Sequence, residues 1–323
     1  MKAAVTGGNG VVGQALVRHL VREGHGVVAL ARSKHASDVL EGLGADTMQG
    51  DVLDPRSLVP LVAGCEVVFH VAGVNEMCSR DPGHMDRVNV EGTLNVKRAA
   101  QTAHVPRMVH TSSAVTVGEA PGTVATEATA HRGSYLSRYE RSKHLAELAF
   151  FEEPGELEVV AVNPSSVQGP GRAGGTGRLF IELVNGTLPF VVATTFSIVD
   201  IDDCARGHLL AATRGVSGER YLLSGASLDM GAALDLLAAV TGRRPRPRVL
   251  PGWVAAVGAG VVEAGSRLVG ARPKLCREMV RVLRAGHVYD GTRATRDLGL
   301  AYTPVEETLR RSIEWFRGEG LLS

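Results

Sequence analysis

The chain has 323 residues, of which 44% are hydrophobic, and its 35 basic and 34 acidic residues leave a formal net charge of +1. This length and apolar content suit one large globular unit or two interlocked ones, and they argue against a disordered or membrane-embedded chain. The balanced charge shows no footprint for nucleic acid or for an anionic membrane, so we expect a small molecule as the partner.

The start of the chain and its cysteines bear on the compartment. "MKAAVTGGNG" runs straight into a strand and a turn without an apolar segment of signal-peptide length, so we expect a cytoplasmic protein. Cys65, Cys78, Cys204 and Cys276 show neither CxxC nor Cys/His ligand spacing. We therefore expect reduced thiols, without disulfides and without a metal site.

Up to about residue 163, short β-branched runs alternate with helical stretches. These runs are "KAAVTG", "GVVALAR", "ADTMQGD", "EVVFHVAG", "RMVHTSS" and "LEVVAVNP". Near-continuous apolar runs are typical of parallel strands covered by helices on both faces. The pattern predicts an α/β fold with a doubly wound parallel sheet, a Rossmann domain over 1–163.

Beyond this domain the pattern becomes less regular. "NPSSVQGPGRAGGTG" indicates a long loop, and we expect a smaller, mainly C-terminal substrate-binding subdomain over 164–323. Segment 196–214 predicts a strand and then a helix capped by Asp202 or Asp203, and we expect this segment to return to the first domain. Pro near its start and Gly at its end predict a helix over 304–320.

The most apolar window, 253–270, is interrupted by Glu263 and Arg267 and falls short of a membrane-spanning length of about 20 residues. We expect a buried helix that covers an apolar pocket, rather than a segment that attaches to a membrane, and we expect no membrane span.

The first turn carries glycines at a spacing that suits a dinucleotide. Gly7, Gly10 and Gly13 follow the first strand and open a helix, with Asn9 and Val11 in the same turn. Glycine lets the turn close and lets backbone amides approach a pyrophosphate at a helix N-terminus. These residues are predicted to bind the cofactor.

The end of the second strand selects between the two nicotinamide cofactors. A carboxylate there usually binds the ribose of NAD, but this chain has Arg32, Ser33 and Lys34. Two cations and a hydroxyl favour the 2'-phosphate of NADP(H), although NAD(H) stays possible. The alternative is that Arg32 is a solvated loop residue.

Residues at the ends of the next two strands complete the predicted cofactor site. Asp51 and Val52 are expected at the adenine, or else Asp51 caps the helix that starts near Pro55. Val71, Ala72 and Gly73 end the fourth strand with small residues that let a ligand lie against backbone.

Tyr139 and Lys143 stand four positions apart on one face of a helix. The ammonium is expected to lower the phenol pKa from its usual ~10, so that Tyr139 serves as general acid, and to hold the nicotinamide ribose. Ser112 or Ser113, at the carboxyl end of the fifth strand, is expected to polarise the substrate oxygen. Asn89 either binds a proton-relaying water or satisfies backbone groups.

With Gly7, Gly10, Gly13, Ser113, Tyr139 and Lys143 in this order, the sequence resembles the extended short-chain dehydrogenase/reductases. It looks most like their dihydroflavonol 4-reductase-like branch, which includes 3β-hydroxysteroid dehydrogenase-like proteins. The likeness covers essentially the whole chain and includes "GDVLD", "VNVEGTLNV", "YERSK" and "NPSSVQGPG".

The resemblance implies a catalytic Ser113, Tyr139 and Lys143 triad assisted by Asn89. It also implies that Thr111 and Pro164 lie at the cofactor, and that the helices carrying Asn89 and Tyr139 form a homodimer contact. Where related dehydratases carry an Asp-Glu pair, this chain has Ser112 and Ser113, which disfavours dehydration.

These observations predict an NADP(H)-dependent reductase or dehydrogenase that acts on a small, fairly apolar ketone or aldehyde, or on the matching alcohol. A sugar-nucleotide epimerase with tightly held NAD is the alternative, and a non-catalytic dinucleotide sensor comes third. Arg172 and Arg178 either meet an anionic group or are solvated. Glycines 169, 171, 174, 175 and 177 predict a flap that closes over substrate.

Overall fold

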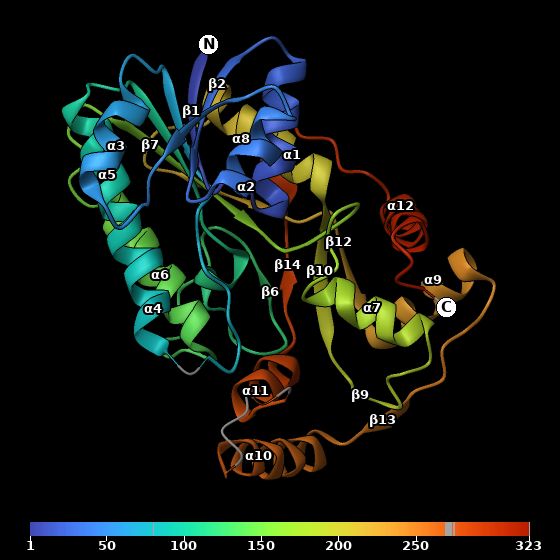
Figure 1. Cartoon of the computed structure of the whole chain (residues 1–323). Helices are drawn as coiled ribbons and strands as arrows, with labels where there is room; N and C mark the ends of the chain where they lie inside the picture. Colours follow the sequence, from blue (N-terminus) through green and yellow to red (C-terminus); the bar gives the residue numbers. More distant parts are fainter. Residues whose placement is uncertain (80, 269–272, 274, 323) are drawn as a thin grey trace.

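The computed structural model describes residues 1–79, 81–268, 273 and 275–322. Within this part of the chain, seven strands form one parallel sheet in the order β11-β7-β5-β4-β1-β2-β3 (Figure 1). Its strands are β1 (Lys2–Thr6), β2 (Gly26–Ala31), β3 (Asp46–Gln49), β4 (Val67–His70), β5 (Arg107–Thr111), β7 (Glu158–Pro164) and β11 (Arg220–Leu223). The predicted doubly wound parallel sheet is therefore confirmed.

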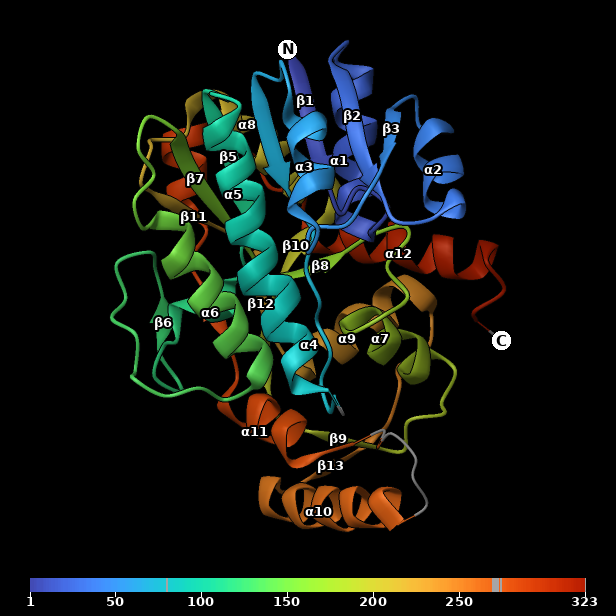
Figure 2. The same ribbon diagram turned by 60° about the vertical axis from the view of Figure 1, so that its left-hand side comes forward.

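Helices cover both faces of this sheet (Figure 2). One face carries α1 (Val11–Arg22), α2 (Lys34–Glu41) and α8 (Ile201–Arg214). The other carries α3 (Pro55–Val62), α5 (Gly92–Thr102) and α6 (Arg138–Phe151), with α4 (Pro82–Asp86) and a π-helix (Arg87–Glu91) leading into α5. A short 3-10 helix (Ala114–Val117) follows β5.

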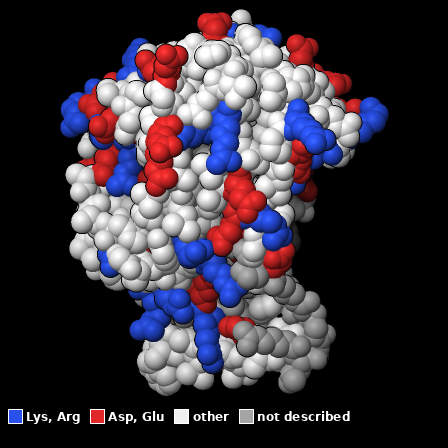
Figure 3. Space-filling view, turned by 90° about the vertical axis from the view of Figure 1, so that its left-hand side faces the viewer, with Lys and Arg blue, Asp and Glu red and all other residues white. Residues whose placement is uncertain are grey.

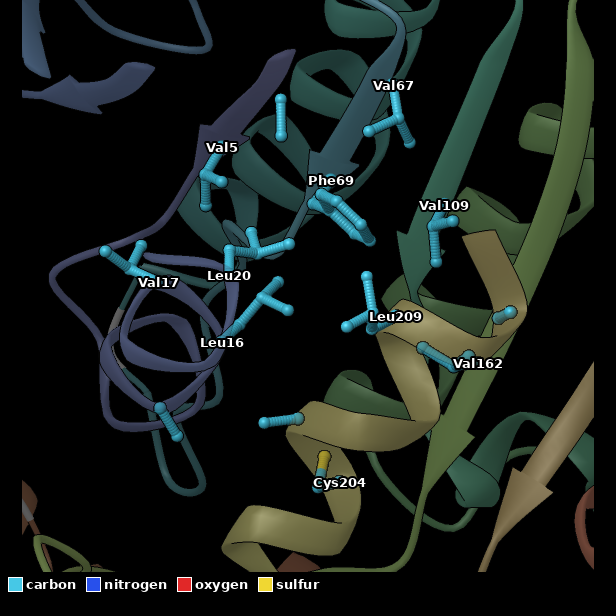
Figure 4. Packing of buried hydrophobic residues seen from close by; sticks show 14 of the residues in the cluster. Val5, Leu16, Val17, Leu20, Val67, Phe69, Val109, Val162, Cys204 and Leu209 are labelled. Atoms are coloured by element: carbon cyan, nitrogen blue, oxygen red, sulfur yellow. The ribbon is translucent and has the colours of Figure 1, made fainter. Parts of the chain in front are cut away.

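Strand residues alternate between the two layers, as the pleat requires. Val5 and Phe69 point towards Leu16 of α1 and Leu209 of α8, and all are buried (Figure 4). Their chain neighbours, such as Val68, instead join the cluster beneath α3 and α5. Because both faces are covered, the central strands are mainly apolar, which explains the runs seen in the sequence, whereas the edge strand β3 is partly exposed.

A second layer of elements lies beyond the carboxyl ends of the strands (Figure 1). A small sheet joins β8 (Ser166–Gln168), β10 (Thr195–Asp200) and β12 (Ala226–Asp229). Around it lie α7 (Thr176–Val184), α9 (Met230–Thr241) and α12 (Val305–Gly318), whose apolar faces share one core. The remaining elements are β6 (Val124–Ala125) with β14 (Val288–Tyr289), β9 (Phe190–Val192) with β13 (Arg248–Leu250), α10 (Gly252–Leu268), α11 (Arg277–Ala285) and a π-helix (Ala294–Leu298).

The chain crosses between the two regions more than once. After the predicted boundary at residue 163, α8 packs against α1 and β11 extends the large sheet beside β7. The helix after β10 is capped by Asp200, whose side chain accepts from the Asp202 backbone N–H, so the predicted caps Asp202 and Asp203 were wrong. The division into domains at residue 163 stays a prediction.

Helix α10 departs from the predicted buried helix. It lies at the outer edge of the molecule, and the Trp253 side chain is 68% exposed. Residues 269 and 270 of the predicted apolar segment lie outside the described residues. No helix in the described part of the chain has the length and apolarity needed to cross a bilayer.

Candidate active site

A cleft of about 350 Å³ opens at the carboxyl ends of β1 and β4, where the strand order reverses direction. The predicted cofactor residues that line it are Gly7, Asn9, Gly10, Val11, Gly13, Arg32, Val52, Val71, Ala72 and Gly73. Val12, Leu30, Val74, Val88 and Arg172 complete the lining. The loops after β1, β2, β3 and β4 thus converge on one volume, as an open α/β sheet provides.

Two of the glycines are required by close approach of backbone. Gly7 has a φ of 71°, and a β-carbon there would lie 2.4 Å from the Ala72 backbone nitrogen. A β-carbon at Gly13 would lie 2.2 Å from the Gly7 carbonyl oxygen. Helix α1 begins at Val11 without a side-chain cap at Gly10, so its first backbone N–H groups face the cleft. This cradle fits the pyrophosphate of a dinucleotide.

The three polar residues after β2 have different surroundings. Arg32 is exposed at the mouth of the cleft. Ser33 caps α2 by accepting from the Ala36 backbone N–H, and Lys34 pairs with Asp38 at 2.9 Å. Arg32 is therefore the cation of this group that lies at the cleft.

Asp51 occupies the turn after β3 and does not cap α3. Its side chain accepts from the Leu53 backbone N–H at 2.9 Å, whereas Asp54 caps α3. Val52 follows Asp51 into the lining of the cleft.

Asn89 lies fully buried in the π-helix that precedes α5. Its side-chain oxygen accepts from the Val74 backbone N–H at 2.7 Å, and its amide nitrogen donates to the Val74 carbonyl and to Ser142 Oγ. Of the two predicted roles, the structure shows the satisfaction of backbone groups. Asn89 thereby ties the loop after β4, which lines the cleft, to helix α6; π-helical turns are frequent at functional sites.

Ser113 and Arg172 both act on the phenol of Tyr139. Burial raises the pKa of Tyr139 above its usual value, and Ser113 and the charge of Arg172 oppose this rise. The sequence had instead predicted that Lys143 lowers this pKa. The net direction found is upward, because removing a phenolate from water outweighs the groups that stabilise it.

Lys143 is buried on the same helix, and its Nζ donates to the Thr111 carbonyl at 2.7 Å. Burial lowers the pKa of Lys143 to about 8, and the nearby Glu147 carboxylate opposes the shift. A β-carbon at Gly73 would lie 3.3 Å from Asn89 Oδ1 and 3.8 Å from Lys143 Nζ. The cleft and the predicted catalytic residues are therefore adjacent.

The other predicted residues, Thr111, Ser112 and Pro164, lie outside the lining of the cleft among the described residues. Thr111 ends β5, and its hydroxyl bonds His208 Nε2 at 2.7 Å. Ser112 has a buried hydroxyl without a partner among the described atoms, whereas Ser113 lowers the pKa of Tyr139, which favours Ser113 of the two. Pro164 is buried at the end of β7.

Buried polar contacts fix helix α6 beneath the site. Glu147 accepts hydrogen bonds from Thr116, Asn163 and Arg220, at 3.0, 2.5 and 2.9 Å. Because the carboxylate is nearly fully buried and fully paired, it holds α6 against β7 and β11.

The other end of α6 is held by the C-terminal region. The Glu278 side chain on α11 accepts from the backbone N–H groups of Arg138 and Cys78. Cys78 forms a disulfide with Cys276, so the expectation of reduced cysteines was wrong for this pair. Cys65 and Cys204 are free and buried, and scattered spacing gave no signal that Cys78 and Cys276, 198 positions apart, would meet.

Arg172 is the charged residue of the cleft that the sequence did not assign to the cofactor. It comes from the glycine-rich loop after β8, it lines the cleft, and its charge acts on Tyr139. Its Nε is buried without a partner among the described atoms. The glycine-rich composition indicated a loop but not where the loop would fold.

Comparison with known proteins agrees with this geometry. Residues 3–224 match the family described as the NAD dependent epimerase/dehydratase family. The chain is 32% identical to a putative dihydroflavonol 4-reductase of Synechocystis sp., over 98% of this chain and 94% of that protein. It is 31% identical to sterol demethylase protein B of Methylococcus capsulatus, over the whole length of both.

Among solved structures, that of gox2253 superposes with a TM-score of 0.84 at 31% identity, covering 100% of this chain and 99% of the other. The fold, the cleft and these relatives give the same answer. The chain belongs to the NAD dependent epimerase/dehydratase family, the extended short-chain dehydrogenase/reductases, and is an NAD(P)-dependent oxidoreductase.

Proposed function

We propose that the protein is an NADP(H)-dependent reductase or dehydrogenase in which Tyr139 is the general acid or base. The observation that carries this proposal is the position of Gly73 in the cleft lining, where a β-carbon would lie 3.8 Å from Lys143 Nζ and 3.3 Å from Asn89 Oδ1. Tyr139, one helical turn before Lys143, is acted on by Ser113. The Tyr139 phenol and the Ser113 hydroxyl lie next to the proposed dinucleotide site, where they can transfer a proton to a carbonyl oxygen and hydrogen-bond it.

The residues at the cleft fit a nicotinamide dinucleotide. The α1 N-terminus and the Gly7 turn would hold the pyrophosphate, Val52 would lie at the adenine, and Lys143 would hold the nicotinamide ribose. Arg32 at the mouth supports binding of a 2'-phosphate and hence NADP(H) over NAD(H). When bound, such a cofactor supplies the hydride for the substrate carbon.

The chain's own residues then move one proton. In the reducing direction the Tyr139 hydroxyl donates its proton to the substrate oxygen, and Ser113 hydrogen-bonds the same oxygen as negative charge develops on it. The raised pKa of Tyr139 keeps the phenol protonated at neutral pH, which suits an acid. Arg172 favours the phenolate left behind, and the two effects together tune the transfer.

We propose a small, fairly apolar ketone or aldehyde as substrate, bound by residues of the 164–323 region. The apolar window 253–270 no longer supports this choice, because α10 exposes its large side chains rather than covering the cleft. The support comes from the relatives, whose names refer to a dihydroflavonol and to a sterol.

NADPH oxidation against a panel of apolar ketones and aldehydes tests the function. Tyr139→Phe is expected to lower kcat/KM by about 10²–10⁴ with unchanged NADPH affinity. Tyr135→Phe is the matched control, because the Tyr135 ring packs at a tilt against His131 and His144 and does not line the cleft. A Tyr139→Phe protein as active as the wild type would refute the proposed acid.

The cofactor that purifies with the protein separates this proposal from sugar-nucleotide epimerisation. A reductase must exchange its oxidised cofactor at every turnover, so we expect exchangeable NADP(H). Tightly retained NAD, together with binding of a nucleoside diphosphate sugar, would favour the epimerase instead.

We also propose a homodimer through α5 and α6. Leu148 on α6 is 50% exposed although it is a large apolar residue. Sedimentation of Leu148→Glu beside the wild type tests this contact.

A further inference from the structure

Helix α10 presents large apolar side chains to solvent. Trp253, Val257 and Val261 are 68%, 62% and 68% exposed, and Val262 is 42% exposed. The spacing of four places the first three side chains on one helical face. Large exposed apolar stripes of this kind mark surfaces that are covered by a partner.

The opposite face of α10 is made of small residues. Ala255 and Ala259 are buried and pack with Val280 of α11. A helix that stabilises only the fold buries its large side chains and exposes its small or polar ones. Here the arrangement is reversed, so folding does not account for the tryptophan and the valines outside.

The chain around this helix is the most basic part of the protein. Residues 243–284 contain ten Lys and Arg against two Glu, a net charge of +8 in a chain whose total is +1. The remainder is therefore at −7, and the balanced total hides a strong asymmetry. This local charge corrects the expectation that the chain has no footprint for an anionic surface.

Two arginines of this segment, Arg277 and Arg284, lie close to α10. A β-carbon at Gly260 would lie 3.0 Å from Arg277 Nε, and one at Gly252 would lie 2.8 Å from Arg284 Nε. Both arginines are exposed. In Figure 3 blue side chains border the pale lobe at the lower end of the molecule, where α10 lies.

We propose that α10 docks onto the surface of an anionic lipid bilayer, lying in the plane of the interface. A tryptophan-bearing apolar face flanked by arginines is the combination that holds an interfacial helix. The 17 residues of α10 span about 25 Å, and the helix lies on the surface without crossing it.

Charge separates this occupant from a second copy of the chain. A two-fold contact through α10 would place one lobe of +8 against another, and like charges that meet across an interface weaken it. An anionic bilayer supplies the opposite charge and an apolar layer for Trp253 together.

Binding of the full-length protein to vesicles tests the proposal. Vesicles of phosphatidylcholine with about one third phosphatidylglycerol are compared with phosphatidylcholine alone, at low and high salt. Since Trp253 and Trp315 are the tryptophans of the chain, a Trp315→Phe variant reports on Trp253 alone. We expect a blue shift of its fluorescence and at least tenfold stronger binding to the anionic vesicles, weakened by salt.

Variants then identify the surface. A triple Trp253→Ser, Val257→Ser, Val261→Ser protein is expected to bind anionic vesicles at least tenfold more weakly, with unchanged NADPH affinity as evidence of folding. Val216→Ser removes a side chain that is 58% exposed elsewhere and should bind like the wild type. Arg248→Glu, at an exposed site, should weaken binding about fivefold or more.

Three results would overturn the proposal: no binding to anionic vesicles, equal binding by the triple variant, or a concentration-dependent dimer that the triple variant abolishes. The last would identify a second copy of the chain as the occupant of this face.

Discussion

Alanine substitutions at Gly7, Gly10 and Gly24 distinguish three effects: strain of the backbone, steric clash with neighbouring backbone, and obstruction of the cofactor cradle. Gly7 and Gly24 share a positive φ, of 71° and 77°, but no described atom lies within 4 Å of a β-carbon at Gly24. At Gly7 the β-carbon would lie 2.4 Å from the Ala72 nitrogen. Gly10 has an ordinary φ of −75°, and its β-carbon would lie 3.3 Å from the Gly7 carbonyl.

The expected magnitudes follow from these contacts. Gly24→Ala should cost about 1–2 kcal/mol of unfolding free energy, from the left-handed backbone alone. Gly7→Ala should cost this plus about 1–3 kcal/mol, because strand-end backbone must shift away from the new methyl group. Gly10→Ala should cost less than about 1 kcal/mol yet weaken NADPH binding at least tenfold, because the methyl group enters the cradle.

Denaturant unfolding gives the stabilities, and titration of NADPH fluorescence gives the affinities. Gly24→Ala is the control for strain and should bind NADPH like the wild type. Equal stability of Gly7→Ala and Gly24→Ala, or unchanged affinity of Gly10→Ala, would refute the steric reading of the turn.

Three further changes probe the site. Because the pKa of Lys143 is lowered to about 8, its charge is present below that pH and lost above it, so the affinity of the wild type for NADPH should fall from pH 7 to pH 10. The Lys143→Gln variant should bind NADPH weakly at every pH. A wild-type affinity that does not change with pH would contradict this prediction. Arg172→Met should raise KM for NADPH about tenfold, whereas Arg178→Met, which breaks only a surface pair with Glu182, should not. Cys78→Ser should lower the unfolding free energy by about 2–4 kcal/mol, and a reductant should lower that of the wild type by the same amount. A proteolytic digest under non-reducing conditions that yields no peptide linked through Cys78 and Cys276 would contradict the disulfide.

Local patterns carried most of the fold from the sequence. The central strands β1, β2, β4, β5 and β7 are covered on both faces, so each appears as a short, mainly apolar run with a turn after it. β11 was missed because "RYLL" is short and owes its place to pairing with β7. The cap of α8 was misassigned because Asp200, Asp202 and Asp203 stand together, and only the backbone geometry distinguishes them.

The same distinction applies to the site. The glycine turn is local, and its residues line the cleft, whereas their binding of the cofactor stays a prediction. Arg172 reaches the cleft through the packing of a long loop, which leaves no periodic signal in the sequence. The pKa of a buried phenol depends on how far the surrounding residues exclude water from it. The spacing of Tyr139 and Lys143 in the sequence therefore could not predict the direction of the Tyr139 pKa shift.

The attachment of α11 to the start of α6 has a consequence for biosynthesis. The bonds from Glu278 and the Cys78–Cys276 link join residues made early to residues made near the end. When α6 leaves the ribosome, the residues that hold its first turn have not yet been made. These contacts can form only after residues 276–278 have emerged, so the final position of α6 depends on a late step of synthesis.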